Sequence, residues 1–209
     1  MSSEVGRPKW VEQLRLLPQL VESLPPRLRH GRRVAPAHLI AAQYYCEVQV
    51  ELELAAGEAI TPERGEGRLL HELLLAMRSV EREELIGRII SGRRCACRFP
   101  LLAEVEDVPV AGLPDAVVFE RGKPVEVTEL KTVEVIPPSP WRDHVVQAWV
   151  YGLLPDLMGF DCSELRLSVR YVRRGWEPFP LLEAVPLDLR EVAWEALEKK
   201  HLATCGHSS

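Results

Sequence analysis

The feature that most constrains the fold is a change in hydrophobic period near residue 98. Before it, stretches such as GRLLHELLLAMRSVEREELIGRII repeat their apolar residues at the spacing of an amphipathic helix. Residues 98–134 instead alternate, are rich in valine and contain turn residues at Gly112, Pro114 and the segment ERGKP (residues 120–124), a pattern typical of two or three strands joined by hairpins. Helical patterns around a block of short strands predict a mixed α/β fold.

The elements around this block are expected to be mainly helical. The predicted helices cover residues 9–24 (interrupted at Pro18), 36–54, 61–90, 139–154 and 187–202, and a further strand covers residues 165–171. In the second helix, Leu39, Ile40, Tyr44 and Val48 are spaced for one buried face. We therefore expect a helical amino-terminal segment (1–60), a core (61–175), and a carboxy-terminal helix (176–209) that packs back on the amino-terminal segment.

Charge and hydropathy narrow the class of protein. The 209 residues carry a formal net charge of −5, and no apolar run approaches the roughly 18–20 residues of a membrane span. The first residues, MSSEVGRPKW, lack the apolar region of a signal peptide, so we expect a cytoplasmic enzyme or binding module with no membrane partner. The five cysteines are an odd number and widely spread, which favours free thiols or metal ligands over a disulfide framework.

The segment that carries chemistry joins Asp115 to Glu129 and Lys131. Period-two geometry places Glu129 and Lys131 on one face of a strand, with Leu130 on the other, and a turn at Arg121-Gly122 folds Asp115 back beside Glu129. Two carboxylates beside a lysine form a site for a hard divalent cation, Mg²⁺ or Mn²⁺, next to a proton-transfer group. In the alternative interpretation, Glu129 and Lys131 are only the exposed side of a half-buried strand.

Two helices add polar residues to this pattern. Gln147 and Tyr151 are four residues apart, and His144 lies three residues before Gln147, so all three share one helix face. On the leucine-rich helix, His71 is either a partly exposed core residue or a ligand. A zinc-protease motif with Glu72 is excluded, because it needs a histidine at position 75, where this chain has leucine.

In this order, the polar residues resemble the motifs of the PD-(D/E)XK nucleases, and more narrowly those of the RecB-like exonucleases. The matching motifs are His71, Pro114-Asp115, Glu129-Leu130-Lys131 and Gln147-x-x-x-Tyr151. Tyr45-Cys46, upstream of His71, is similar to the CRISPR-associated RecB-like exonuclease family. The resemblance covers roughly residues 34–174 and implies a restriction-endonuclease-like core, a mixed central sheet flanked by helices, with a helical amino-terminal addition.

The resemblance also implies a role for each motif residue. His71, Asp115 and Glu129, with the backbone carbonyl of Leu130, would coordinate Mg²⁺ or Mn²⁺. Lys131 would position or deprotonate the attacking water and offset charge in the transition state. The remaining implied contacts are with DNA: Gln147 and Tyr151 orient the lysine or hold the strand, and arginines of residues 93–98 and 166–174 grip phosphates.

The implied function is a metal-dependent DNA exonuclease that prefers single strands or ends and acts in CRISPR adaptation or in recombination and repair. Its partners would be DNA and CRISPR adaptation proteins, with the oligomeric state left open. Two alternatives remain: a catalytically inactive scaffold or DNA-binding protein of the same fold, and a sequence-specific endonuclease.

The cysteines depart from the family pattern. In the CRISPR-associated family an amino-terminal cysteine joins three near the carboxy terminus to hold an iron–sulfur cluster, which needs four thiolates. Cys46 matches the first position, but the carboxy-terminal region offers only Cys205. Three interpretations stay open: the cluster is lost and Cys46 is a buried thiol, Cys46 and Cys205 join Cys95 and Cys97 in an atypical site, or the cluster domain is incomplete.

Overall fold

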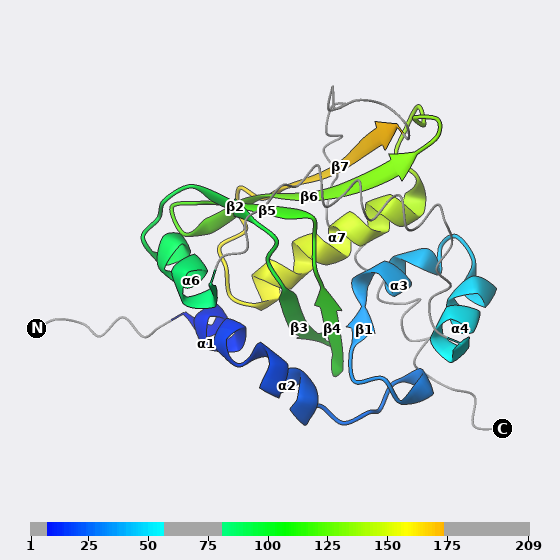
Figure 1. The fold of residues 1–209 in the computed structure, drawn as a ribbon, viewed down its shortest axis with the longest axis horizontal. Helices are drawn as coiled ribbons and strands as arrows, with labels where there is room; N and C mark the ends of the chain where they lie inside the picture. Colours follow the sequence, from blue (N-terminus) through cyan, green and yellow to red (C-terminus); the bar gives the residue numbers. More distant parts are fainter. Residues whose placement is uncertain (1–7, 57–80, 174–209) are drawn as a thin grey trace, which may run out of the picture.

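In the computed structural model, residues 8–56 and 81–173 are described, and they form helices packed around two small sheets (Figure 1). The helices are α1 (Lys9–Arg15), α2 (Leu17–Ser23), the 3₁₀ turn η1 (Arg29–Gly31), α3 (Ala37–Ala42), α4 (Glu47–Ala56), α6 (Arg82–Ile90) and α7 (Arg142–Leu157). The strands are β1 (Ala35–Pro36), β2 (Cys95–Cys97), β3 (Leu101–Val105), β4 (Val108–Gly112), β5 (Ala116–Glu120), β6 (Lys123–Val133) and β7 (Arg166–Arg173).

Both sheets contain parallel and antiparallel neighbours. One has the order β1-β4-β3, with β1 parallel to β4, and the other has the order β2-β5-β6-β7, with β7 parallel to β6. Residues 113–115 link β4 of the first sheet to β5 of the second, so they form a corner between the two. The predicted α/β class is confirmed, while the narrower restriction-endonuclease-like core stays a prediction.

Two tight hairpins set the register of the strands. Arg121 and Gly122 both have positive φ, 52° and 79°, and join β5 to β6 at the predicted turn. Glu106 and Asp107 do the same between β3 and β4, with φ of 45° and 63°. Paired positive φ values match the natural twist of a hairpin, but Glu-Asp lacks the glycine or asparagine that usually signals such a turn. Residues 98–134 therefore form four strands, and the prediction of two or three was wrong.

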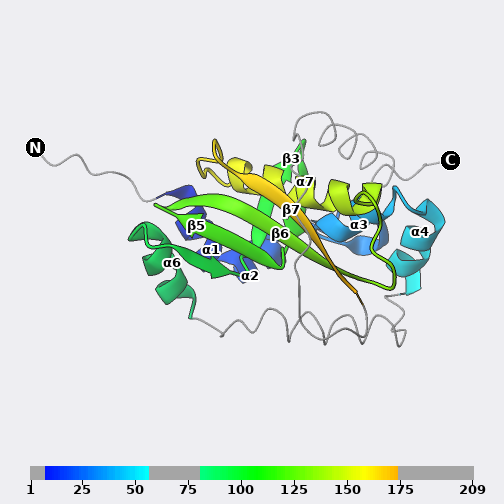
Figure 2. The same ribbon diagram turned by 90° about the horizontal axis from the view of Figure 1, so that it is seen from above.

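Helix α7 is the central element, and its position explains its sequence. It packs against α3 on one side and against strands of both sheets on the other, so nearly all of its turns are buried (Figure 2). Apolar residues consequently surround the helix instead of forming a single stripe. The polar residues Gln147 and Tyr151 are buried with them, which places them inside the molecule.

The amino-terminal helices share the core of the sheets. Trp10 of α1 stacks on Phe160 with ring centroids 4.8 Å apart, and Phe99 and Phe119 lie in the same aromatic cluster. Strand β1 also pairs with β4. Residues 8–56 are thus built into the same hydrophobic core as the strands.

Three predicted helices differ from the structure or lie partly or wholly outside the described residues. The predicted 36–54 helix is divided into α3 and α4, so the single buried face is broken and Val48 is 68% exposed. Of the helix predicted over 61–90, the structure describes only the part from Arg82 to Ile90. The helix predicted over 187–202 lies outside the described residues, and so does the predicted boundary between the amino-terminal segment and the core near residue 60. Within 8–56 and 81–173, no helix is long and apolar enough to cross a membrane.

Candidate active site

Asp115 occupies the corner between the two sheets, directly before β5. Pairing of Ala116 with Thr128 brings it alongside the middle of β6, where its Oδ2 accepts a hydrogen bond of 2.8 Å from the backbone N–H of Leu130. The carboxylate is buried. The turn at Arg121-Gly122 therefore folds Asp115 back onto the strand that carries Glu129, as the sequence predicts.

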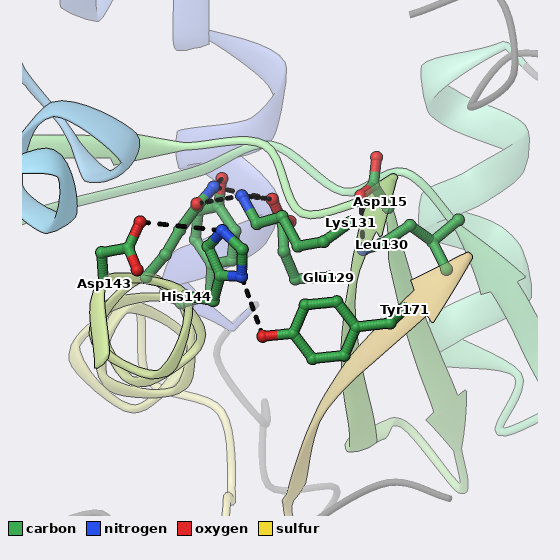
Figure 3. A network of polar contacts seen from close by, with 9 residues as sticks. Asp115, Glu129, Leu130, Lys131, Asp143, His144 and Tyr171 are labelled. Carbon is green, nitrogen blue, oxygen red and sulfur yellow. Dashed lines mark hydrogen bonds and ion pairs between the residues drawn. The ribbon is translucent and has the colours of Figure 1, made fainter. Parts of the chain in front are cut away.

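Glu129 and Lys131 extend from β6 toward α7 on one face of the sheet, as Figure 3 shows. The Lys131 Nζ lies 3.1 Å from Glu129 Oε1, and the Glu129 side chain is only 8% exposed. A carboxylate this deeply buried is not part of an exposed strand face, so that alternative interpretation is wrong. Burying a charged group costs free energy unless hydrogen bonds and opposite charge compensate it, and here both are supplied.

Gln147 of α7 connects these side chains. Its Oε1 accepts a hydrogen bond of 2.7 Å from Lys131 Nζ, and its Nε2 donates to Glu129 Oε1 at 2.8 Å and to the Tyr151 hydroxyl at 2.9 Å. An ammonium only donates and a carboxylate only accepts, so the two partners fix the orientation of the amide. Gln147 thereby holds the lysine and the glutamate at a set separation.

Tyr151 supports Gln147 from the next turn of α7. Burial raises the pKa of Tyr151, and the charge of Glu129 adds to the rise, while hydrogen bonds from Gln147 and the Leu113 backbone oppose it. The side chain is therefore a neutral phenol at physiological pH. A Cβ on Gly112 would lie 2.4 Å from Tyr151 Cε1, so only glycine lets the ring occupy this place. The sequence showed Gly112 only as a turn residue.

A second polar group lies beside Lys131, and its chemistry was not predicted. Tyr171 of β7 is the cross-strand partner of Lys131, and its hydroxyl accepts the backbone N–H of Trp141 at 3.0 Å and lies 2.9 Å from His144 Nδ1. Burial lowers the pKa of His144 to about 4, helped by the charge of Lys131 and opposed by Asp143. The imidazole is therefore neutral at physiological pH. The only sequence signal was the spacing of His144 and Gln147 on one helix face.

Three other residues named from the sequence are not among the side chains that the structure brings together at this site. His71 and Cys205 are outside the described residues. Arg170 lies on the sheet face opposite Lys131, where its guanidinium forms an ion pair of 2.7 Å with Glu126, so it does not point toward the candidate site. Because Arg170 alternates with Tyr171 along the strand, it lies on the face away from Lys131, and its expected contact with DNA phosphates stays a prediction.

The described cysteines do not converge. Cys46 lies between α3 and α4, whereas Cys95 and Cys97 lie on β2 near α6, toward the other end of the molecule (Figure 1). Burial raises the pKa of the Cys97 thiol to about 12, which opposes thiolate ligation. Across 8–56 and 81–173, no group of three or more His, Cys, Asp or Glu side chains could hold a metal. Cys205, the other member of the expected atypical site, lies outside the described residues, and the three described members, Cys46, Cys95 and Cys97, do not lie together.

The remaining question for the site is whether its residues fit a divalent cation. Asp115, directly before β5, and Glu129, on the neighbouring strand β6, supply carboxylate oxygens, the hard donors that Mg²⁺ and Mn²⁺ prefer. These donors fit a Mg²⁺ or Mn²⁺ ion, because proteins commonly bind such ions through one or two carboxylates. The ligand roles of His71 and the Leu130 carbonyl stay predictions.

Comparison with known proteins adds little to this picture. No protein family and no curated protein sequence matches the chain. A solved structure described as SSO0001 is 18% identical over 95% of this chain and 87% of its own, with a TM-score of 0.45. At these values the likeness assigns neither a fold family nor a function.

Proposed function

We propose that the protein is a metal-dependent DNA exonuclease that hydrolyses single strands or strand ends, with Asp115, Glu129 and Lys131 as its catalytic residues. The observation that carries the proposal is that Gln147 holds the buried Glu129 beside Lys131, while a second buried carboxylate, Asp115, is bonded to the backbone N–H of Leu130 between them. Buried ionisable groups lower stability unless they are compensated, and their clustering is more common at functional sites than elsewhere. The same residues form the order of motifs that resembles the PD-(D/E)XK nucleases.

Each side chain has a distinct task in this proposal. Asp115 and Glu129 would hold a Mg²⁺ or Mn²⁺ ion, which supplies a water of lowered pKa and offsets negative charge on the phosphate. Lys131 is more exposed than Glu129, with side-chain exposures of 22% and 8%. Its ammonium is therefore the group that reaches the substrate, where it orients the attacking water and stabilises charge on a phosphate oxygen.

Gln147 and Tyr151 serve as positioning residues. The amide holds Lys131 beside Glu129, and the buried phenol holds the amide. Fixed positions matter because misplacing a catalytic group by about 1 Å can lower the rate by about 100-fold. A role in CRISPR adaptation or in recombination and repair, in the cytoplasm, is the narrower proposal that follows from the resemblance.

The test is degradation of end-labelled single-stranded and duplex DNA in the presence of Mn²⁺ or Mg²⁺. Wild type is compared with Glu129→Gln and with Glu104→Gln, a matched change at an exposed position of β3. We expect wild type and Glu104→Gln to degrade the single strand from an end, and Glu129→Gln to lose this activity.

Each alternative has its own outcome in this assay. Intact DNA with folded wild type would favour the scaffold, and discrete internal fragments from duplex DNA would favour the sequence-specific endonuclease. Equal degradation by Glu129→Gln and wild type would place the activity at another site.

A further inference from the structure

Trp141, the residue directly before α7, is unusual among the described tryptophans because it is half exposed. It is 50% exposed, whereas Trp10 and Trp149 are 4% and 7% exposed. Its position is nevertheless fixed. The backbone N–H donates to the Tyr171 hydroxyl at 3.0 Å, and the indole lies against the His144 ring, with centroids 5.1 Å apart, and against the edge of Tyr171 at 6.2 Å.

The ring contacts place Trp141 beside the candidate catalytic residues. Tyr171 is paired with Lys131 across the parallel strands β6 and β7. His144 lies on α7 one turn before Gln147, which binds Lys131. Trp141 is therefore separated from the catalytic lysine by a single layer of side chains, two of whose members are drawn in Figure 3.

Other apolar side chains are exposed on the connection that carries Trp141. Val135 and Ile136, on the same β6–α7 connection, are 73% and 36% exposed. His144, the ring that supports the indole, carries no charge at physiological pH. Exposed apolar and aromatic groups suit the flat faces of unpaired bases, whereas paired bases in a duplex are stacked on one another and present phosphates instead.

We propose that Trp141 is a stacking platform for an unpaired base of the substrate, a subsite beside Lys131 that makes the site selective for single-stranded DNA. This subsite rests on the proposed nuclease function. A rigidly held indole loses little conformational entropy when a base stacks on it, and stacking on an aromatic ring is tolerant of base identity. The subsite therefore confers preference for an unpaired strand without preference for a sequence.

The test compares two ligands that differ only in their bases. The binding of a fluorescein-labelled oligothymidylate and of an abasic strand of equal length is measured by fluorescence anisotropy in EDTA, so that hydrolysis does not occur. The variants are Trp141→Leu, which lacks an aromatic plane, and Trp141→Phe, which keeps one. Leu157→Ala, an exposed apolar side chain at the opposite end of α7, is the control.

We expect Trp141→Leu to bind oligothymidylate about tenfold more weakly than wild type, the usual loss for one stacked base. It should bind the abasic strand as wild type does. Trp141→Phe should retain most of the affinity for oligothymidylate, and Leu157→Ala all of it.

Several results would overturn the subsite. An equal loss by Trp141→Leu on both strands would show a general effect on the fold, and no loss on either would show that the indole does not touch a base. If wild type bound both strands equally well, the stacking subsite would be ruled out, and the proposed nuclease function would be unaffected. If wild type bound neither strand in EDTA and also left DNA intact with Mn²⁺, the proposed function would fail together with the subsite.

Discussion

Gln147 is the residue on which the candidate site depends most directly, because one amide joins three polar groups. We expect Gln147→Leu to lower kcat by about 100-fold, since Lys131 and Glu129 would lose their fixed separation. Stability should fall by about 1–3 kcal/mol, because buried polar partners would be left unsatisfied. Steady-state kinetics and urea unfolding measure both effects, with exposed Gln49→Leu on α4 as the control. Unchanged kcat in Gln147→Leu would remove Gln147 from the site.

Tyr151 contacts Gln147 and not Lys131, so its removal should lower activity less than removal of Gln147. In Tyr151→Phe the ring still packs beside Gly112, and Gln147 keeps its bonds to Lys131 and Glu129. We expect kcat to fall by no more than about tenfold, with about 1–2 kcal/mol lost from the free energy of unfolding for the missing hydrogen bonds to Gln147 and the Leu113 backbone. A loss of activity larger than that of Gln147→Leu would instead place the phenol in contact with the substrate.

At the scale of elements, the site depends on the close approach of β4 and α7. Gly112→Ala would place a methyl group 2.4 Å from Tyr151 Cε1, so the ring or the helix must move. We expect a loss of stability of about 1–3 kcal/mol, as for overpacked cores, together with reduced kcat. Gly87→Ala in α6 is the matched control, because its Cβ would meet nothing within 4 Å. It should raise stability by up to about 1 kcal/mol through helix propensity.

The outcome of Gly112→Ala separates two explanations of any loss. If the defect comes from the clash with the ring, it should be much smaller when Tyr151 is already alanine, as unfolding of the two single variants and the double variant would show. Additive losses would mean that Gly112 acts through its own backbone and not through Tyr151.

The strands and helix α7 also show which features of the fold and site could be predicted from the sequence. The change in hydrophobic period predicted the strands and the α/β class. The alternation of side chains along a strand, together with the Arg121-Gly122 turn, predicted that Asp115 lies beside β6. Both features follow from local geometry, so the sequence could indicate them. Other features depend on contacts between segments far apart in the chain. Tyr171 meets Trp141 and His144 only because β7 pairs with β6, and no local pattern encodes that pairing. The Glu106-Asp107 turn was missed because it lacks the glycine or asparagine that usually signals a turn with positive φ.

At the scale of the whole molecule, the partly buried His144 couples stability to pH. Its folded pKa of about 4 lies below the ordinary 6.5, so the unfolded chain binds more protons between these values. His144 therefore makes the fold less stable as the pH falls from 6.5 to 4, and has little effect above that window. As the pH falls from 6.5 to 4, we expect wild type to lose more unfolding free energy than His144→Gln, which has no titrating imidazole at this position. Urea unfolding of both proteins at several pH values would measure the difference.

The opposite trend is also informative. A shift in favour of wild type on acidification would mean that Asp143 stabilises a protonated imidazole more than burial and Lys131 disfavour it. The His144 ring that contacts Trp141 would then carry a positive charge.

The central claim is that Asp115 and Glu129 form a metal-binding catalytic site, and calorimetric titration with Mn²⁺ tests it most directly. Asp115→Asn is the informative variant, because asparagine can still accept the Leu130 N–H while removing the charge that binds the ion. We predict that wild type and Glu104→Gln bind Mn²⁺ alike and that Asp115→Asn binds it at least about tenfold more weakly, in line with the dependence of such sites on carboxylate charge. Absence of Mn²⁺ binding by folded wild type, or equal binding by Asp115→Asn, would contradict the claim.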